Sequence, residues 1–206
     1  SGATLAAAGE DESYDAQTAG GSYVSNGGTL NGNLKLDGKN TPAKEDSEEK
    51  LAAILKAAPR AEFNGNSTVN GNIDNNLGLL IVNQGATLNI EGESNKVTNN
   101  GYIDLAGVLN GQIDNNGNIT VLDSAAHMTS FDGGELNISA DVAASSLVAE
   151  ESNADEIYVS AGSSLDLDSE KLKTEQLTTY GTAKLGVDYA ANAKVGNGGT
   201  LDLASN

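Results

Sequence analysis

The chain of 206 residues has no cysteine, no tryptophan and only 2 prolines, and its aromatic residues amount to 4%. Without cysteine, it forms no disulfide and offers no thiolate to a metal ion. Large aromatic side chains supply much of the buried area in compact globular cores. Their scarcity favours a core of small aliphatic residues stacked in layers, which is typical of repeat proteins.

Basic residues and long apolar runs are also scarce. The chain has 11 Lys and Arg against 29 Asp and Glu, a net charge of −18. This excess disfavours attraction to phosphate backbones or anionic lipid, so we expect no nucleic-acid partner. The acidic excess indicates a charged surface that keeps the chain soluble. A surface that binds cations or a basic partner is the alternative interpretation. No run approaches the roughly 20 apolar residues of a membrane-spanning helix, so we expect no direct membrane insertion of this chain.

The most informative segment present runs from Thr68 to Asp123. Short pieces with alternating apolar residues are separated there by turns such as Asn-Asn-Gly. Alternation with a period of two predicts strands, and Gly and Asn between them predict turns. Self-similarity of this kind is typical of solenoids. We therefore predict an all-β fold, a right-handed parallel β-helix (β-solenoid), over residues 23–206.

Two interpretations of the repeat length remain open. Two series of apolar residues each recur with a short, nearly constant step. The first series is Ile73, Leu88, Ile103 and Ile119, and the second is Ile81, Val97 and Ile113. A much longer offset instead relates the phrases TLNGNLKLD (29–37), TVNGNIDNN (68–76) and VLNGQIDNN (108–116). The first interpretation gives turns of roughly 15–16 residues with an apolar core, and the second gives turns of about 20 residues.

The Asn and Gly residues have a structural interpretation in such a coil. Corners require residues that tolerate a positive φ, and Gly and Asn do so most readily. Stacked Asn side chains can also hydrogen-bond from one turn to the next. The candidates are the pairs Asn75-Asn76, Asn99-Asn100 and Asn115-Asn116. We interpret them as structural residues and not as a glycan-binding site.

Two segments depart from the repeat. Residues 1–22 are small, polar and acidic without a period, and we expect an irregular leader or N-terminal cap. The start at Ser1-Gly2 without a signal peptide suggests a fragment excised from a longer protein. Residues 41–60 predict a helical insertion, which begins at Thr41-Pro42 and is ended by Pro59. One helical face is apolar, with Leu51, Ile54, Leu55 and Ala58.

The helical insertion at about 41–60 has two interpretations. Its apolar face packs against the scaffold or caps an open end of the solenoid. Alternatively it binds a partner, because insertions in repeat proteins gather on the functional face.

Catalytic signatures are missing from the sequence. The single His is His127 and the single Arg is Arg60, and the nucleophile elbow, the calcium-binding repeats and the phosphate-binding loop are absent. Strand alternation places Asp166, Asp168 and Asp202 on the solvent side. We therefore assign no catalytic, cofactor-binding or metal-binding residue and no cofactor, and expect no enzyme activity. Partner-binding residues are not identifiable from the sequence.

A recurring phrase, G-x-[TSE]-L-[ND]-[IL], resembles a known family. It occurs at 85–90, 133–138, 162–167 and 198–203, and partially at 27–32. With the Asn-Asn-Gly turns and the acidic, cysteine-free composition, it resembles the passenger regions of bacterial autotransporter adhesins and related type V secreted proteins. The resemblance implies a β-helix displayed at the bacterial outer membrane or secreted. No functional residue of the family maps onto this chain.

Three functions follow as hypotheses. The first is an adhesin-like passenger fragment that mediates adhesion or self-association through its solenoid faces and its insertion. Its partner would be a host or bacterial surface protein, a glycan, or another copy of the chain. The second is a structural stalk that carries a functional tip. The third is a carbohydrate-active β-helix enzyme, a lyase or glycosidase, which the single Arg disfavours.

Overall fold

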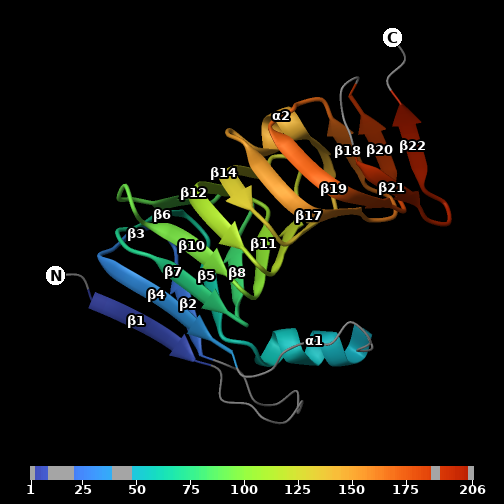
Figure 1. The fold of residues 1–206 in the computed structure, drawn as a ribbon. Coiled ribbons are helices and arrows are strands. Elements are labelled where there is room, and N and C mark those ends of the chain that lie inside the picture. Colours follow the sequence, from blue (N-terminus) through green and yellow to red (C-terminus); the bar gives the residue numbers. More distant parts are fainter. Residues whose placement is uncertain (1–2, 9–20, 39–47, 187–190, 204–206) are drawn as a thin grey trace.

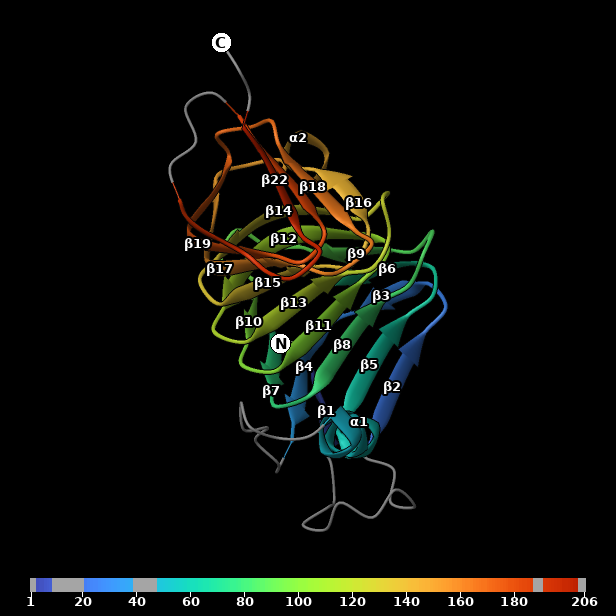
Figure 2. The ribbon, with the colours of Figure 1, turned by 90° about the vertical axis from the view of Figure 1, so that its right-hand side faces the viewer.

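The computed structural model describes residues 3–8, 21–38, 48–186 and 191–203. The chain winds into a parallel β-solenoid of about seven turns (Figures 1 and 2), as the repeat predicts. Each turn contributes strands to three sides of the coil. Strands on the same side of successive turns pair with one another in parallel. The sheets therefore run along the axis of the coil.

The first sheet contains, in order, β1 (Ala3–Ala8), β4 (Gly32–Asp37), β7 (Ile73–Asn76), β10 (Lys96–Asn99), and parts of β12 (Val108–Asn115), β14 (His127–Asp132), β17 (Ser152–Val159) and β19 (Leu172–Thr179). The second sheet contains β2 (Ser22–Ser25), β5 (Arg60–Phe63), β8 (Leu79–Val82), β11 (Tyr102–Leu105), β13 (Asn118–Val121), β15 (Glu135–Ile138), the second halves of β17 and β19, and β21 (Asn192–Val195).

The third side is divided between two sheets. Its first part contains β3 (Gly28–Leu30), β6 (Asn66–Val69), β9 (Thr87–Ile90) and the first halves of β12 and β14. Its second part is a separate four-stranded sheet of β16 (Asp141–Ala143), β18 (Ser164–Leu167), β20 (Thr182–Leu185) and β22 (Thr200–Leu203). The short helix α2 (Ala144–Leu147) lies at the break between them.

The turns differ in length, so neither predicted step is correct throughout. Ile73 pairs with Val97, and Val97 pairs with Ile113. The asparagines that follow in the same strands, Asn75, Asn99 and Asn115, are separated by 24 and then by 16 positions. The phrases at 68–76 and 108–116 are therefore two turns apart, and the two turns are unequal.

The longest described turn contains the helical insertion. It runs from β4 to β7, where Leu34 pairs with Ile73. Asn33 and Asn72, the residues just before this pair, are separated by 39 positions. The insertion lengthens the turn without changing which residues face inward, since Leu34 and Ile73 are both fully buried.

The predicted apolar series are partly wrong for the same reason. Ile103 does pair with Ile119, and both are fully buried. Leu88, however, pairs with Leu109 in the third sheet. Ile81 pairs with Asp104 on the outer side of the second sheet. Corners of unequal length therefore place residues of one predicted series in different sheets, and in the case of Ile81 on the outer face.

The core consists of inward rows of aliphatic side chains. One row in the second sheet is fully buried over its middle strands, at Leu80, Ile103, Ile119, Leu136, Ile157 and Leu177. Stacking similar side chains at each turn removes their apolar surface from water, and this burial is the main stabilising term.

The insertion contains helix α1 (Glu48–Ala57), which projects from the N-terminal part of the coil (Figures 1 and 2). The start predicted at Thr41 lies outside the described residues. The helix ends at Ala57, just before Pro59, as the proline predicts, and Arg60 at the end of the predicted segment already belongs to strand β5. The Arg60 guanidinium donates to the carbonyl oxygens of Leu55 (3.3 Å) and Lys56 (3.1 Å), so it caps the last helical turn. Ile54 is buried, as its place on the apolar face predicts.

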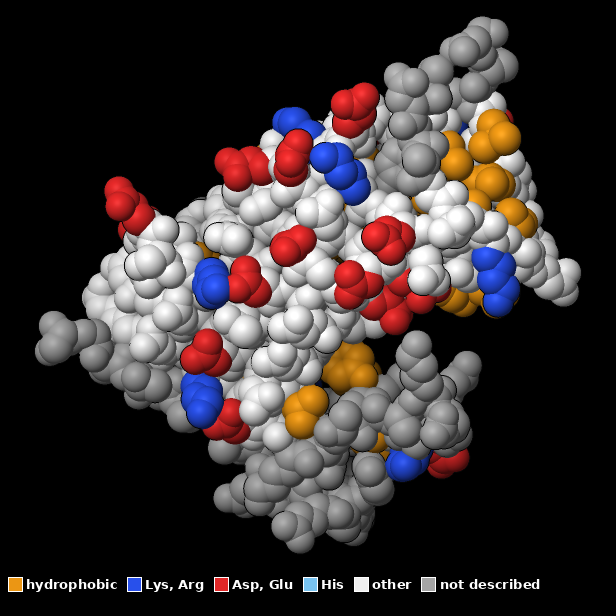
Figure 3. Space-filling view, viewed as in Figure 1, with side chains coloured by type: hydrophobic (Ala, Val, Ile, Leu, Met, Phe, Trp, Pro, Cys, Tyr) orange, Lys and Arg blue, Asp and Glu red, His pale blue; other side chains and the backbone are white. Residues whose placement is uncertain are grey.

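The two ends of the coil differ. Strand β1 pairs with β4 along its whole length, so residues 3–8 form a regular strand and not an irregular leader, while the alternative of an N-terminal cap stays a prediction. The rest of that segment, residues 9–20, lies outside the described part. At the C-terminal end, the inward positions Val195 and Leu203 are 47% and 64% exposed. Hydrophobic side chains are accordingly visible at that end (Figure 3).

Candidate binding surface

Buried asparagines connect successive turns at the corner between the first and second sheets. Asn75 Nδ2 donates to Asn99 Oδ1 (2.7 Å), and Asn99 Nδ2 donates to Asn115 Oδ1 (2.7 Å). Asn115 Nδ2 completes the row by donating to the Gly133 carbonyl (3.0 Å). The three asparagines are almost fully buried, with exposures of 0%, 0% and 1%. The predicted asparagine ladder is therefore confirmed, and its residues hold turns together.

Three glycines of the same corner, Gly78, Gly101 and Gly117, are required for close stacking, whereas Gly133 and Gly134 in the next turn have the predicted positive φ (84° and 66°). A Cβ on Gly117 would lie 2.2 Å from the Gly101 carbonyl oxygen, and one on Gly101 would lie 2.5 Å from that of Gly78. None of these three glycines has a positive φ. No described asparagine has one either, and Leu77 is the non-glycine residue that does (φ 59°).

Exposed amides form further links along the outside of the coil. Asn116 Nδ2 donates to Asn100 Oδ1 (3.2 Å). Two other corners carry equivalent links, Asn70 to Asn31 (2.6 Å) and Asn64 to Asn26 (3.2 Å). The asparagines on these corners therefore have structural partners.

The residues with potential for chemistry lie apart from one another in structural roles. His127 is half-buried, and its Nδ1 lies 2.7 Å from the Ser146 carbonyl oxygen. Asp166 faces outward, as predicted, and forms an ion pair with Lys184 (2.9 Å). Among the described residues, no group of three or more His, Asp or Glu side chains is placed to hold a metal ion.

Asp168 is held by the backbone of α2. Its carboxylate accepts hydrogen bonds from the Ser145 hydroxyl (2.6 Å) and the Ser145 N–H (2.9 Å). Partial desolvation acts to raise the pKa of Asp168, but these hydrogen bonds outweigh it and the pKa is lowered. The contact anchors the short helix to the four-stranded sheet.

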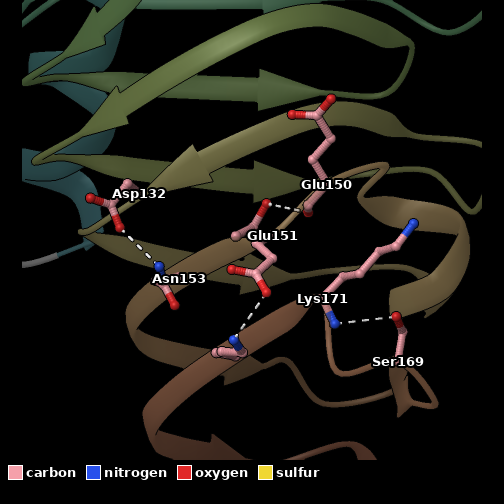
Figure 4. A network of polar contacts seen from close by, with 8 residues as sticks. Asp132, Glu150, Glu151, Asn153, Ser169 and Lys171 are labelled. Carbon is pink, nitrogen blue, oxygen red and sulfur yellow. Dashed lines mark hydrogen bonds and ion pairs between the residues drawn. The ribbon is translucent and has the colours of Figure 1, made fainter.

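The outer face of the first sheet carries interspersed charges of both signs (Figure 3). Links between neighbouring turns recur there (Figure 4). Asn153 Nδ2 donates to Asp132 (3.1 Å), and Lys173 forms an ion pair with Glu151 (3.5 Å). Because these groups are exposed, each link contributes about 0–1 kcal/mol. This face is solvated and carries ion pairs between lysines and carboxylates, although carboxylates outnumber lysines on it.

The outer face of the second sheet differs in composition. We call the outward residues of β11, β13, β15, β17 and β19, with Tyr180 at the following corner, the tyrosine face. It consists of Tyr102, Asp104, Asn118, Thr120, Glu135, Asn137, Glu156, Tyr158, Gln176, Thr178 and Tyr180. It contains three carboxylates and no Lys or Arg. The nearest bases in these rows are Lys194 on β21, one turn beyond Thr178, and Arg60 on β5, two turns before Tyr102.

Hydrogen bonds fix the middle of the tyrosine face. Asn137 Nδ2 donates to Asn118 Oδ1 (2.7 Å), and Asn118 Nδ2 donates to Glu135 Oε1 (3.2 Å). One turn further, the Thr178 hydroxyl donates to Glu156 Oε1 (3.0 Å). These bonds hold the side chains in defined positions before any ligand arrives.

Two tyrosines form an aromatic pair at the C-terminal part of the tyrosine face. The rings of Tyr158 and Tyr180 lie with centroids 5.3 Å apart and planes inclined by 35°. Gly196 packs against the Tyr180 ring, since a Cβ there would approach it to 2.3 Å. Desolvation, Tyr180 and the Glu135 carboxylate, in that order, raise the pKa of Tyr158. The nearby carboxylate makes the potential at the pair negative.

Asp104 lies three turns from the aromatic pair, between Ile81 and Thr120 in its row. Burial raises the pKa of its carboxyl group. No described residue donates a hydrogen bond to this carboxylate or forms an ion pair with it. The sequence pattern marks Asp104 and Tyr158 only as outward strand positions. It does not bring them onto one face, because that depends on the unequal turn lengths.

Comparisons with known proteins find no match to this chain. No family model, no curated protein and no solved structure is significantly similar to it. Among the described residues, no helix is long and apolar enough to cross a membrane.

Proposed function

We propose that the chain is a non-catalytic adhesin-like passenger fragment, displayed on a bacterial surface or secreted, that binds a partner through its solenoid faces. The sequence supports this through its resemblance to autotransporter passenger regions. The geometry adds a rigid coil that holds outward side chains in fixed rows. A host or bacterial surface protein, a glycan or a second copy of the chain are the candidate partners.

The tyrosine face is the observation that carries the proposal. On the first sheet several carboxylates pair with lysines, as Asp37 does with Lys35 (3.0 Å), whereas Asp104 on the tyrosine face has no partner among the described residues. Partly buried charges without partners and clustered, partly exposed aromatic side chains are costly in a purely structural surface. They are typical of surfaces that contact another molecule.

A structural stalk is the second candidate, and the asparagine ladder favours it. Links between turns at several corners stiffen the coil along its axis, which a spacer requires. A stalk needs no adhesive face, so the two functions predict different behaviour in a binding assay.

Adhesion of coated beads tests the proposal. Beads that carry the chain at one end through a biotin tag would be incubated with bacterial and epithelial cells and washed under flow. Retention above that of beads carrying an unrelated acidic protein is expected for an adhesin. Retention equal to the control, together with a monomer at all concentrations in light scattering, would favour the stalk.

A further inference from the structure

We propose that the tyrosine face binds an extended protein segment bearing two basic side chains, one on the Tyr158–Tyr180 pair and the other at Asp104. This inference rests on the proposed adhesive function and names the chemistry of the partner. The charges, the rings and the spacing along this face all point to that chemistry.

The aromatic end of the face has the composition of a cation site. Tyrosine ring faces attract Lys and Arg side chains, and Arg guanidinium groups also stack on them. The carboxylates of Glu135 and Glu156 belong to the row beside Tyr158, in the turns of β15 and β17. Glu156 accepts a bond from the Thr178 hydroxyl and has no ion-pair partner among the described residues. Rings and negative charges thus act on the same cation.

Asp104 provides the second contact. A half-buried carboxylate has lost part of its hydration, and no described group compensates for the loss. An incoming ammonium or guanidinium group supplies the missing partner and restores the balance. Two carboxylates on other faces already have such partners, since Asp166 pairs with Lys184 and Asp114 pairs with Lys96.

The spacing of the two contacts fits an extended chain. Asp104, Thr120, Asn137 and Tyr158 occupy one row in four successive strands. Three steps between neighbouring strands span about 14 Å. Four residues of an extended peptide cover about 13.5 Å, and residues i and i+4 point to the same side. Basic residues four positions apart therefore reach both contacts at once.

Charge separates this partner from a neutral glycan. A neutral sugar would gain from the tyrosine rings but would leave Asp104 desolvated and the carboxylates of this face unpaired. A basic segment compensates both. The net charge of −18 also attracts a cationic partner over a longer range, and salt weakens that attraction.

Peptide titration tests the inference. A fluorescein-labelled decapeptide of Ser and Thr with Arg at positions 3 and 7 would be titrated with the whole chain and followed by anisotropy at low salt. We expect saturable binding that weakens at least tenfold when Gln replaces both Arg residues. Moving the second Arg from position 7 to 6 turns it to the opposite side and weakens binding about threefold or more.

Variants locate the contact. Asp104→Asn is isosteric and should weaken binding about threefold to tenfold, and Tyr158→Leu about fivefold, whereas Tyr158→Phe keeps the ring and should bind normally. Asp74→Asn on the first sheet is the matched control and should change affinity less than twofold. Circular dichroism and a melting curve confirm that each variant is folded.

Three results would overturn the inference. These are no saturable binding up to millimolar peptide, equal effects of Asp104→Asn and Asp74→Asn, or displacement of the peptide by a neutral gluco-oligosaccharide. Bead adhesion distinguishes failure of the proposed adhesive function from failure of the proposed basic partner. If the beads adhere but the Asp104→Asn and Tyr158→Leu variants adhere equally well, the adhesive function stands and the basic partner is wrong.

Discussion

The buried asparagine ladder makes a quantitative prediction about stability. Replacing Asn99 with Ala removes the bond from Asn75 Nδ2 and the bond to Asn115 Oδ1, both 2.7 Å long and both buried. Asn75 Nδ2 keeps the Tyr102 carbonyl as a partner at 2.9 Å. Asn115 Oδ1 keeps a longer contact with the N–H of Gly117 at 3.3 Å.

The variant also loses longer contacts of 3.3–3.4 Å that Asn99 makes with the Gly101 N–H and with the carbonyls of Gly101 and Asn118. The two short bonds, at about 1 kcal/mol each, with partial loss of satisfaction at Asn115 and Gly101, give a destabilisation of about 3 kcal/mol for Asn99→Ala. For a chain of this length that corresponds to a melting temperature lower by roughly 6–12 °C. Asn100 is the matched control, because it is the next residue, is exposed and accepts a single 3.2 Å bond from Asn116. Asn100→Ala should change stability by less than about 0.5 kcal/mol.

Urea unfolding followed by far-UV circular dichroism measures both variants. Asn75→Ala provides a second comparison within the ladder, because Asn75 Oδ1 is buried and has no hydrogen-bond partner among the described residues. Its removal relieves that penalty, so it should cost about 1 kcal/mol less than Asn99→Ala. Equal stabilities of the Asn99 and Asn100 variants would refute a stabilising role of the ladder.

Three further predictions concern other parts of the coil. Gly117→Ala should destabilise the chain by more than about 2 kcal/mol in urea unfolding, because its Cβ would meet the Gly101 carbonyl, and a stability equal to wild type would contradict the stacking account. Asp104→Asn should raise the melting temperature at pH 7. The folded-state pKa of Asp104 is raised, so ionisation of its carboxyl group lowers the free energy of unfolding as pH rises from about 3.8 through that pKa. Below this pH range the wild type and the variant should be equally stable. A difference in melting temperature that persists at pH 3 would refute desolvation of the carboxylate as the cause. Leu203→Glu should reduce any self-association seen by light scattering, since Leu203 lies 64% exposed in the last turn, whereas the control Leu122→Glu, at 47% exposed, should not.

Much of the architecture was predictable because it depends on local patterns. Alternating apolar residues and Asn-Asn-Gly turns predict short strands and tight corners, and similar phrases predict that turns stack. The asparagine ladder follows directly, since identical residues at one corner meet in consecutive turns. Helix α1 was predictable from its own apolar face, and its end at Ala57 follows from Pro59, although the predicted insertion at 41–60 also includes Arg60, which the structure assigns to β5.

The turn length was not predictable, because corners accept extra residues at little cost. The turn from Ile73 to Val97 is half as long again as the turn from Val97 to Ile113, yet all three side chains are fully buried in one row. Core burial constrains which residues face inward, but it does not constrain how many residues a corner contains. A fixed period therefore failed for Leu88 and Ile81.

The candidate site depended on that register and so could not be found from the chain alone. Outward residues have no core partner to align them, and Asp104 and Tyr158 are far apart in sequence but only three strand steps apart in space. The sequence by itself determined the coil, its aliphatic core and its asparagine corners, because each of these is repeated from turn to turn. Only the tertiary structure decided which acidic and aromatic side chains share a face, because the length of each corner determines which residues are stacked.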